Sequence, residues 1–436
     1  MSLSKDILNG DLKAVKRRVS LGALVNDFDP YGYTPLIISL MTQQTDIFDY
    51  LLNHGADVNR PDLFGQPPLH WAVKLEQPDL CARLLKKGAF SNTLSSYGEP
   101  LLVYPLLKKN RELIDVLEKS GTHRLCAEDY IFTKYIGHHF ELKGFGCYKN
   151  YNNILSLVDY QGFRLEFSLQ QLYRQFENYL ALEHKLPVDH QKDYLDILER
   201  AIKLRSIKKV FPTQQEQECA HYLKKMNLIP MAFDGHAVSL VYTDHFVALC
   251  DRAQHRSKTV MFFKLPDKIN FETATYFLYG KKSQLYWQEL PESMGWELID
   301  SLPVSHQKVG NCSWANIETA PVLIAGLMQL EQKKKLDSKI LMSFFDRWID
   351  WSQSFLLKQA ALRIQQLQGD RRFSLALTLL NVILQHGENK TIHDSLSFLL
   401  KKEFYQKEFK DILKQHIINN GEFTDSASKI IKYIEK

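Results

Sequence analysis

The sequence has few features typical of a membrane protein, a metal site or a disulfide-stabilised fold. Its 436 residues include only six cysteines, and none of them forms a Cys-x-x-Cys pair. This spacing argues against a zinc ribbon or a disulfide framework, and it favours reduced thiols in a cytosol-like compartment. No apolar run approaches the ~18 residues needed to span a membrane. The first residues lack the apolar core of a secretory signal.

The sequence also lacks a strong charge of either sign. The formal net charge is +5, with 24% charged and 45% hydrophobic residues. Such a composition is typical of a soluble globular protein, and the small charge does not favour nucleic-acid binding. The basic run 203–209 contains no aromatic residue for base stacking, which indicates a solvated helix end. The length favours two or three domains.

A repeat of 33 residues is the clearest pattern in the first quarter of the chain. Two series of glycines follow this period: Gly32, Gly65 and Gly98, and Gly22, Gly55, Gly88 and Gly121. Pro35 and Pro68 fit the first turns of helices, and Gly55 and Gly88 fit left-handed helix ends. The unit resembles the ankyrin repeat, a β-turn plus two helices. The resemblance implies about four repeats in residues 1–125. They would bind a protein through their concave face and β-turn tips, and carry no chemistry of their own.

Beyond the repeats, the sequence predicts an α+β multidomain fold. Residues 126–210 are expected to form a helical connecting segment that belongs to the same domain as the residues after it, with two amphipathic helices between residues 168 and 210. Residues 211–330 are expected to form an α/β core, because strand-like alternation begins only there. Residues 331–436 predict a C-terminal helical bundle or cap. Two aromatic runs, 276–279 and 284–288, fit either strands or short helices.

One motif combines residue types that support nucleophilic chemistry. In Gln307-Lys-Val-Gly-Asn-Cys312-Ser-Trp-Ala-Asn316 a cysteine precedes an apolar run expected to be helical. The positive end of a helix favours a thiolate, and Asn311 fits the helix cap while Gly310 lets the backbone approach a substrate. Gln307 could aim an amide donor at the oxyanion that forms when the thiolate attacks a carbonyl. The alternative is a structural cysteine beside a core tryptophan.

A histidine and an acid precede this motif. We expect two strands, 237–242 and 246–250, joined by a two-residue turn at Thr243 and Asp244. In that register His236 and Asp251 are direct cross-strand neighbours with Cβ atoms ~5 Å apart. Such a contact orients an imidazole and stabilises its charged form.

Three other histidines fit the role of the base less well. His245 lies at the turn, ~20 Å from Asp251 along the hairpin, and is interpreted as a surface residue. His306 lies beside Gln307 but has no acid with it in sequence. His255 lies in a polar loop and has no evident role.

The order His236, Asp251, Gln307, Cys312 resembles the cysteine-protease clan of the ubiquitin-like-protein proteases, adenovirus-type proteases and YopJ-type acyltransferases. The resemblance covers about residues 230–320. It implies a cysteine-protease-like domain with Cys312 as nucleophile, His236 as base, Asp251 as its orienting acid and Gln307 as oxyanion donor. Two positions depart from the clan, which usually has an aromatic residue where Ala237 stands and glycine where Ser313 stands. Altered chemistry or an inactive site would explain them.

A second resemblance is to papain-like and calpain-like enzymes, which have a glutamine before the cysteine and a tryptophan soon after it. In those enzymes the histidine follows the cysteine. The candidates would be His386, His393 and His416, which lie in segments expected to be helical, so this interpretation ranks second.

The order of ankyrin repeats, Cys-His module and helical tail resembles the ankyrin-repeat effectors of Legionella, of the AnkH type. This resemblance implies type IV secretion into a host cell, in the cytosol or nucleus, and a host protein as partner. We expect a monomer without cofactor or metal. Two functions stay open: a cysteine-protease-like hydrolase or acyltransferase, and a catalytically inactive scaffold that acts only by binding.

Overall fold

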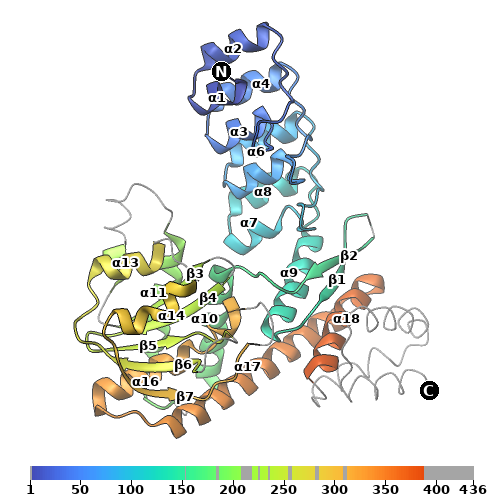
Figure 1. The fold of residues 1–436 in the computed structure, drawn as a ribbon. Coiled ribbons are helices and arrows are strands. Elements are labelled where there is room, and N and C mark those ends of the chain that lie inside the picture. Colours follow the sequence, from blue (N-terminus) through green and yellow to red (C-terminus); the bar gives the residue numbers. More distant parts are fainter. Residues whose placement is uncertain are drawn as a thin grey trace. The chain divides into compact units, whose positions relative to one another are not determined.

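The structure is a computed structural model that describes residues 2–152, 154–182, 186–207, 219–223, 226–233, 236–253, 258–279, 284–307 and 312–386 (Figure 1). The chain divides into two compact units. The first unit is Met1–Thr133 with Cys147–Val158, and the second is Lys134–Gly146 with Asp159–Lys436. The four-segment division at residues 125, 210 and 330 stays a prediction.

Four consecutive helix pairs build most of the first unit. They are α1 (Leu3–Leu8) and α2 (Leu12–Ser20), α3 (Pro35–Met41) and α4 (Thr45–Asn53), α5 (Pro68–Lys74) and α6 (Pro78–Lys86), α7 (Val103–Lys108) and α8 (Arg111–Lys119). Pro35 and Pro68 occupy first helical positions, where the missing N–H removes no hydrogen bond. Gly55 and Gly88 have φ values of 89° and 92°. The left-handed helix ends predicted from the 33-residue period are therefore confirmed.

An asparagine ladder joins the successive repeats. The side-chain amides of Asn26, Asn59 and Asn92 donate to the carbonyl oxygens of Gly55, Gly88 and Gly121 at 2.9, 3.0 and 2.9 Å. Their amide oxygens accept from the backbone N–H groups of Asp57, Phe90 and His123. Each ladder step satisfies backbone groups that the helix end and the next loop leave open, which explains why these asparagines recur every 33 residues.

A β-hairpin follows the last repeat, so the expectation of strands only after residue 211 is wrong. Helix α9 (Arg124–His139) leads to β1 (Phe145–Lys149) and β2 (Leu155–Asp159), which form a two-stranded sheet. Within the first unit Tyr148 is fully buried, and its hydroxyl donates to the Gly98 carbonyl at 3.2 Å. Its ring meets that of Tyr130 edge to face at 5.6 Å. The hairpin is thus fixed to the third β-turn of the repeats.

A five-stranded antiparallel sheet forms the centre of the second unit. Its strands are β3 (Asn227–Phe233), β4 (His236–Tyr242), β5 (Phe246–Cys250), β6 (Val260–Lys264) and β7 (Glu297–Leu302), in the order β3-β4-β5-β6-β7. Strands β4 and β5 confirm the two strands expected at 237–242 and 246–250, whereas the two edge strands were missed. The two aromatic runs left open are helical, in α13 (Phe271–Tyr279) and α14 (Gln284–Ser293).

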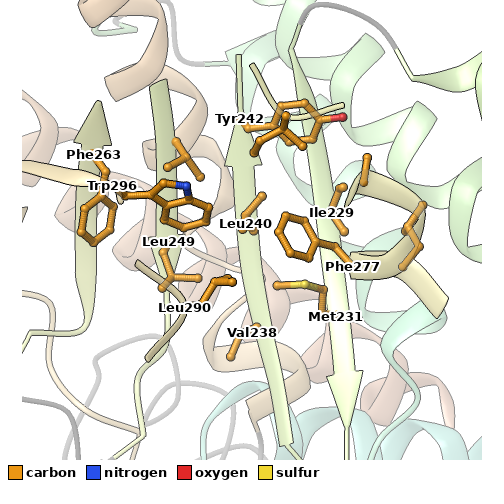
Figure 2. Close-up of a cluster of buried hydrophobic side chains, with 14 of the residues drawn as sticks. Ile229, Met231, Val238, Leu240, Tyr242, Leu249, Phe263, Phe277, Leu290 and Trp296 are labelled. Atoms are coloured by element: carbon orange, nitrogen blue, oxygen red, sulfur yellow. The ribbon is translucent and has the colours of Figure 1, made fainter. Parts of the chain in front are cut away.

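Helices cover both faces of this sheet. Figure 2 shows the buried cluster on one face, with Phe277 of α13 against Ile229 and Met231, and Trp296 beside Leu249. On the other face α16 (Ala320–Lys333) packs against β4 and β5 and is buried from Ala320 to Leu330. A Cβ at Gly326 would lie 2.3 Å from the Phe262 ring. A glycine at this position is therefore what lets the helix approach β6.

The second unit also contains α10 (Leu165–Leu182), α11 (Gln191–Ser206), α15 (Cys312–Ala315), α17 (Ser338–Gln366) and α18 (Gly369–His386). Helices α10 and α11 confirm the two helical patterns expected between residues 168 and 210. Pro321 lies in the first turn of α16, so the chain restarts its helix there. The part of the helical tail expected at 387–436 lies outside the described residues. No helix of the described part is long and apolar enough to cross a membrane.

Candidate functional site

Cys312 begins helix α15, as the sequence predicted. The helix has only four residues, so it sums few peptide dipoles and adds little to the stability of a thiolate. The proposed cap Asn311 and the flanking Gly310 lie outside the described residues. The activation of a thiolate at this position therefore depends on a base.

Ser313, the residue that departs from the protease clan, anchors α15 to its surroundings. Its hydroxyl donates to the Phe163 carbonyl at 3.0 Å and lies 2.6 Å from Nε2 of His138. Burial lowers the pKa of His138 to about 3, so this ring is neutral where it meets the hydroxyl. The next residue, Trp314, is fully buried with its ring 4.4 Å from that of His139. These contacts fix the helix start from one side.

The register between β4 and β5 corrects the predicted pairing. Leu240 lies opposite Leu249, and Tyr242 opposite Val247, so His236 and Asp251 are not direct neighbours. Continued by one pair, this register sets Asp251 opposite Val238. Positions 236 and 251 therefore stay on the same face but become diagonal neighbours, which in a sheet lie ~7–8 Å apart. A long or aromatic side chain spans that separation.

The shift arises at the turn. The backbone N–H of Thr243 donates to the Phe246 carbonyl at 2.8 Å, so Asp244 and His245 occupy the centre of the turn. The Thr243 hydroxyl accepts from the N–H groups of both His245 and Phe246. The expected turn at Thr243 and Asp244 is thus displaced by one residue, and the strand pairing moves by two.

Asp251 is a buried carboxylate directly after β5. It is 2% exposed, and its Oδ1 accepts from the Ala253 N–H at 3.1 Å. Its own N–H donates to the Thr259 carbonyl at 2.8 Å, which extends the pairing of β5 with β6. A buried carboxylate held in this way is suited to orient a neighbouring imidazole.

Asn316 brings the chain segments of the candidate residues together. Its Nδ2 donates to the Ala237 carbonyl at 2.6 Å, and its Oδ1 accepts from the Arg252 N–H at 2.7 Å. Ala237 directly follows His236, Arg252 directly follows Asp251, and Asn316 stands four residues after Cys312. Three segments far apart in sequence therefore meet at one amide.

Gln307 joins the same place through its backbone. Its N–H donates to the Arg252 carbonyl at 2.9 Å. Its side chain is half-buried, and the amide oxygen has no hydrogen-bond partner among the described residues. The backbones of all four candidate segments thus converge where β4 begins and β5 ends.

A buried ion cluster supports this junction. The Arg252 guanidinium donates to Glu318 at 2.5 Å and to Glu141 at 3.0 Å, and both carboxylates are nearly buried. It also donates to the carbonyl oxygens of Ser305 and Ala315 at 2.7 and 2.9 Å. Arg252 therefore ties the end of β5 to α15 and to the segment that leads to Gln307.

Two carboxylates share this single guanidinium. Burial raises the pKa of Glu318 to about 7; Arg252 opposes the rise, and the second carboxylate, Glu141, adds to it. One of the two acids therefore holds a proton near neutral pH, since two buried carboxylates cannot both be ionised cheaply.

The protonation of Glu318 predicts a pH dependence of stability. Between the unfolded pKa of about 4.5 and the folded value of about 7, the folded state holds a proton that the unfolded state releases. The contribution of Glu318 to the free energy of unfolding is fully present below the pKa of the unfolded state. It decreases by up to about 3 kcal/mol as the pH rises through the pKa of the folded state. Glu318→Gln stays neutral, so its urea midpoint should fall less than that of the parent between pH 5 and pH 8. Glu297→Gln, at an exposed position, should follow the parent, and an identical pH dependence in all three would contradict the assignment.

The rival histidines stand apart from this arrangement. His245 lies at the turn, and its side chain is 66% exposed with Nδ1 3.1 Å from Glu331, which agrees with a surface role. His306 is exposed on the segment before Gln307. His386 ends α18; His255, His393 and His416 lie outside the described residues. No group of three or more metal-ligating side chains occurs in the described part of the chain.

Three contributors to the junction were not recognised from the sequence: Asn316, Arg252 and Glu318. Asn316 belongs to the motif around Cys312, but its role depends on the positions of two strands. Arg252 and Glu318 look like surface residues in sequence, because charged side chains are rarely buried unless paired.

Comparison with known proteins agrees with this architecture. Residues 3–121 match the family model of ankyrin repeats, in three copies. None of the curated proteins matches the chain. Among solved structures, that of the Legionella effector AnkH is similar, with a TM-score of 0.76 and 26% sequence identity. The match covers 100% of this chain and 97% of that chain. The chain thus carries ankyrin repeats, and the similarity to AnkH extends over its whole length.

Proposed function

We propose that the chain is a secreted bacterial effector with two functional surfaces. Its ankyrin repeats bind a host protein, and Cys312, His236, Asp251 and Gln307 form a cysteine-protease-like site for acyl transfer or (iso)peptide hydrolysis. The similarity to the Legionella effector AnkH supports the proposal of an effector that is delivered into a host cell. The delivery system that we propose is of type IV. The convergence of four chain segments at Asn316 and Arg252 carries the proposal of the site.

The chemistry follows from the order of the four residues. His236 takes the proton of Cys312, and the thiolate attacks a carbonyl carbon. Gln307 donates to the oxyanion of the tetrahedral intermediate, while Asp251 stabilises the imidazolium. The intermediate collapses to a thioester as His236 returns the proton to the leaving amine. Water then hydrolyses the thioester, or an acceptor amine or hydroxyl takes the acyl group.

An electrophilic ubiquitin or peptide probe tests the enzymatic proposal. The parent is expected to form a covalent adduct at Cys312, and Cys312→Ala should lose it entirely. His236→Ala should slow labelling strongly because the thiolate loses its partner. Peptide mapping by mass spectrometry identifies the modified cysteine.

The second candidate is a protease-like scaffold that acts only by binding. Ser313 favours it, because a residue that the active clan keeps as glycine here makes two buried structural contacts. In that case no probe of a broad panel labels Cys312, and its thiol titrates near the free value of about 8.5.

Exposed aromatic rings on the β-turns support the binding surface. Tyr31, Phe64 and Tyr97 each precede the turn glycine of their repeat, and they are 74%, 63% and 88% exposed. Adjacent turns are joined directly, since the Leu63 N–H donates to the Gly32 carbonyl at 2.9 Å. Aromatic residues are enriched among the side chains that dominate binding energy at protein interfaces.

Removal of these rings should weaken the association with the host protein. We expect the triple variant Tyr31→Ser, Phe64→Ser, Tyr97→Ser to lose at least tenfold in affinity for host proteins that the parent retains, because hot-spot aromatics each contribute about 2 kcal/mol or more. The control is Leu21→Ser, an equally exposed residue at the end of α2. Quantitative affinity purification checks the prediction. Unchanged retention by the triple variant would place the interface elsewhere.

A further inference from the structure

Asn316 is a polar side chain in the buried interior of the second unit. Its side chain is fully buried and bonded on both sides of the amide. A third contact comes from the Cys250 thiol, whose Sγ lies 3.4 Å from the amide oxygen. Burial raises the pKa of Cys250 to about 12, so this thiol keeps the proton that it donates.

The two main bonds of Asn316 have opposite polarity. Ala237 offers a carbonyl oxygen and needs a donor, whereas Arg252 offers an N–H group and needs an acceptor. A carboxamide supplies both from one planar group, and a carboxylate or an aliphatic side chain does not. The residue is therefore matched to the relative placement of β4 and the end of β5.

The chain positions of these contacts connect Asn316 to the proposed chemistry. A shift of the Ala237 carbonyl moves the backbone of His236, and a shift of the Arg252 N–H moves that of Asp251, because each pair is adjacent in the chain. Asn316 lies four residues after Cys312 and is held in turn by the Thr319 hydroxyl, which donates to its carbonyl at 2.7 Å.

We propose that Asn316 is a positioning residue, which sets the distance of the Cys312 thiol from the His236 imidazole and the Asp251 carboxylate. This inference rests on the proposed cysteine-protease-like site. Asn316 touches no substrate in this proposal; it acts by fixing the three backbones that carry the reacting groups.

The pH profile of Cys312 alkylation tests the inference without requiring turnover. Iodoacetamide reacts with the thiolate, so its rate at each pH reports the thiolate fraction. The full chain is alkylated between pH 5 and pH 10, and the Cys312 peptide is quantified by mass spectrometry. In the parent, a thiolate paired with His236 should persist well below pH 8.5. In Asn316→Ala and Asn316→Asp, the profile should move upward by at least one unit, which is about a tenfold loss of rate at pH 6.

The matched control is Asn381→Ala. Asn381 is also a buried asparagine of the second unit, and its Nδ2 donates to the Tyr160 hydroxyl at 2.8 Å. Its loss should lower stability and leave the Cys312 profile unchanged. Asn316→Asp keeps the shape of the side chain and the oxygen that accepts from Arg252. This variant therefore tests the positioning role if Asn316→Ala fails to fold.

The possible outcomes separate the inference from the function on which it rests. A parent profile centred near pH 8.5 contradicts the proposed site itself. A parent profile at low pH that both folded Asn316 variants share overturns the positioning role alone. A profile shifted only in the Asn316 variants supports both.

Discussion

Arg252→Met is expected to destabilise the second unit by about 3–5 kcal/mol, because it leaves a buried pair of acids that carries negative charge without its cation. The guanidinium is 5% exposed and lies against Glu141 and Glu318. It also satisfies the carbonyl oxygens of Ser305 and Ala315. Urea unfolding followed by tryptophan fluorescence measures the loss, since five of the six tryptophans belong to this unit.

Two further variants identify the cause. Arg252→Met combined with Glu141→Gln and Glu318→Gln should recover most of the stability, because no uncompensated charge stays buried. Lys268→Met breaks the exposed ion pair with Asp244 and should change stability by less than about 1 kcal/mol. Equal losses in the single and the triple variant would show that packing, rather than charge, explains the effect.

Trp348→Ala is expected to cost about 3–5 kcal/mol, the range for removal of a large buried aromatic ring. Trp348 is fully buried on α17, and its ring meets those of Phe176 and Tyr179 at 5.2 and 5.5 Å. Its indole N–H donates to the Glu318 carbonyl at 2.9 Å, so the variant also loosens the segment behind α15. Denaturation followed by circular dichroism measures the change.

The neighbouring Trp351 provides the matched control for this prediction. It lies three residues further along α17, stacks on Phe355 at 4.8 Å and is only half-buried. Trp351→Ala should therefore cost clearly less than Trp348→Ala. Similar losses for both variants would contradict the assignment of Trp348 as the centre of this helical core.

The repeats could be predicted from the sequence because their signals are local. Gly55 and Gly88 are required where the backbone is left-handed, and Pro35 and Pro68 where a helix starts. Each repeat presents the same requirements 33 residues later. The asparagine ladder has the same period and could have been found in the same way.

The strand register could not be predicted with the same certainty. It depends on which two residues occupy the turn, and the Thr243 hydroxyl decides this by accepting from two backbone N–H groups. No Asn-Gly or Asp-Gly pair marks the turn in sequence. Strand β3 was missed because it contains Pro230, which is tolerated since β3 is an edge strand.

The buried ion cluster of Arg252, Glu141 and Glu318 could not be predicted from any local sequence pattern. Glu141 is separated from Arg252 by 111 residues, and Glu318 by 66. Charged residues are expected at the surface until a partner is known. The motif from Gln307 to Asn316 indicated where the candidate site lies in the sequence. The contacts of Arg252 and Glu318 that hold its segments together could be identified only from the structure.

A cross-linking measurement tests the central claim most directly. The claim is that position 236 lies within reach of the Cys312 sulfur. In His236→Cys, a short thiol–thiol cross-linker should join positions 236 and 312, and peptide mapping should recover the bridged pair. The same reagent should not bridge His245→Cys to Cys312, because that position lies at the opposite end of β4. Single modification of both thiols in His236→Cys without a bridge would contradict the proposed site.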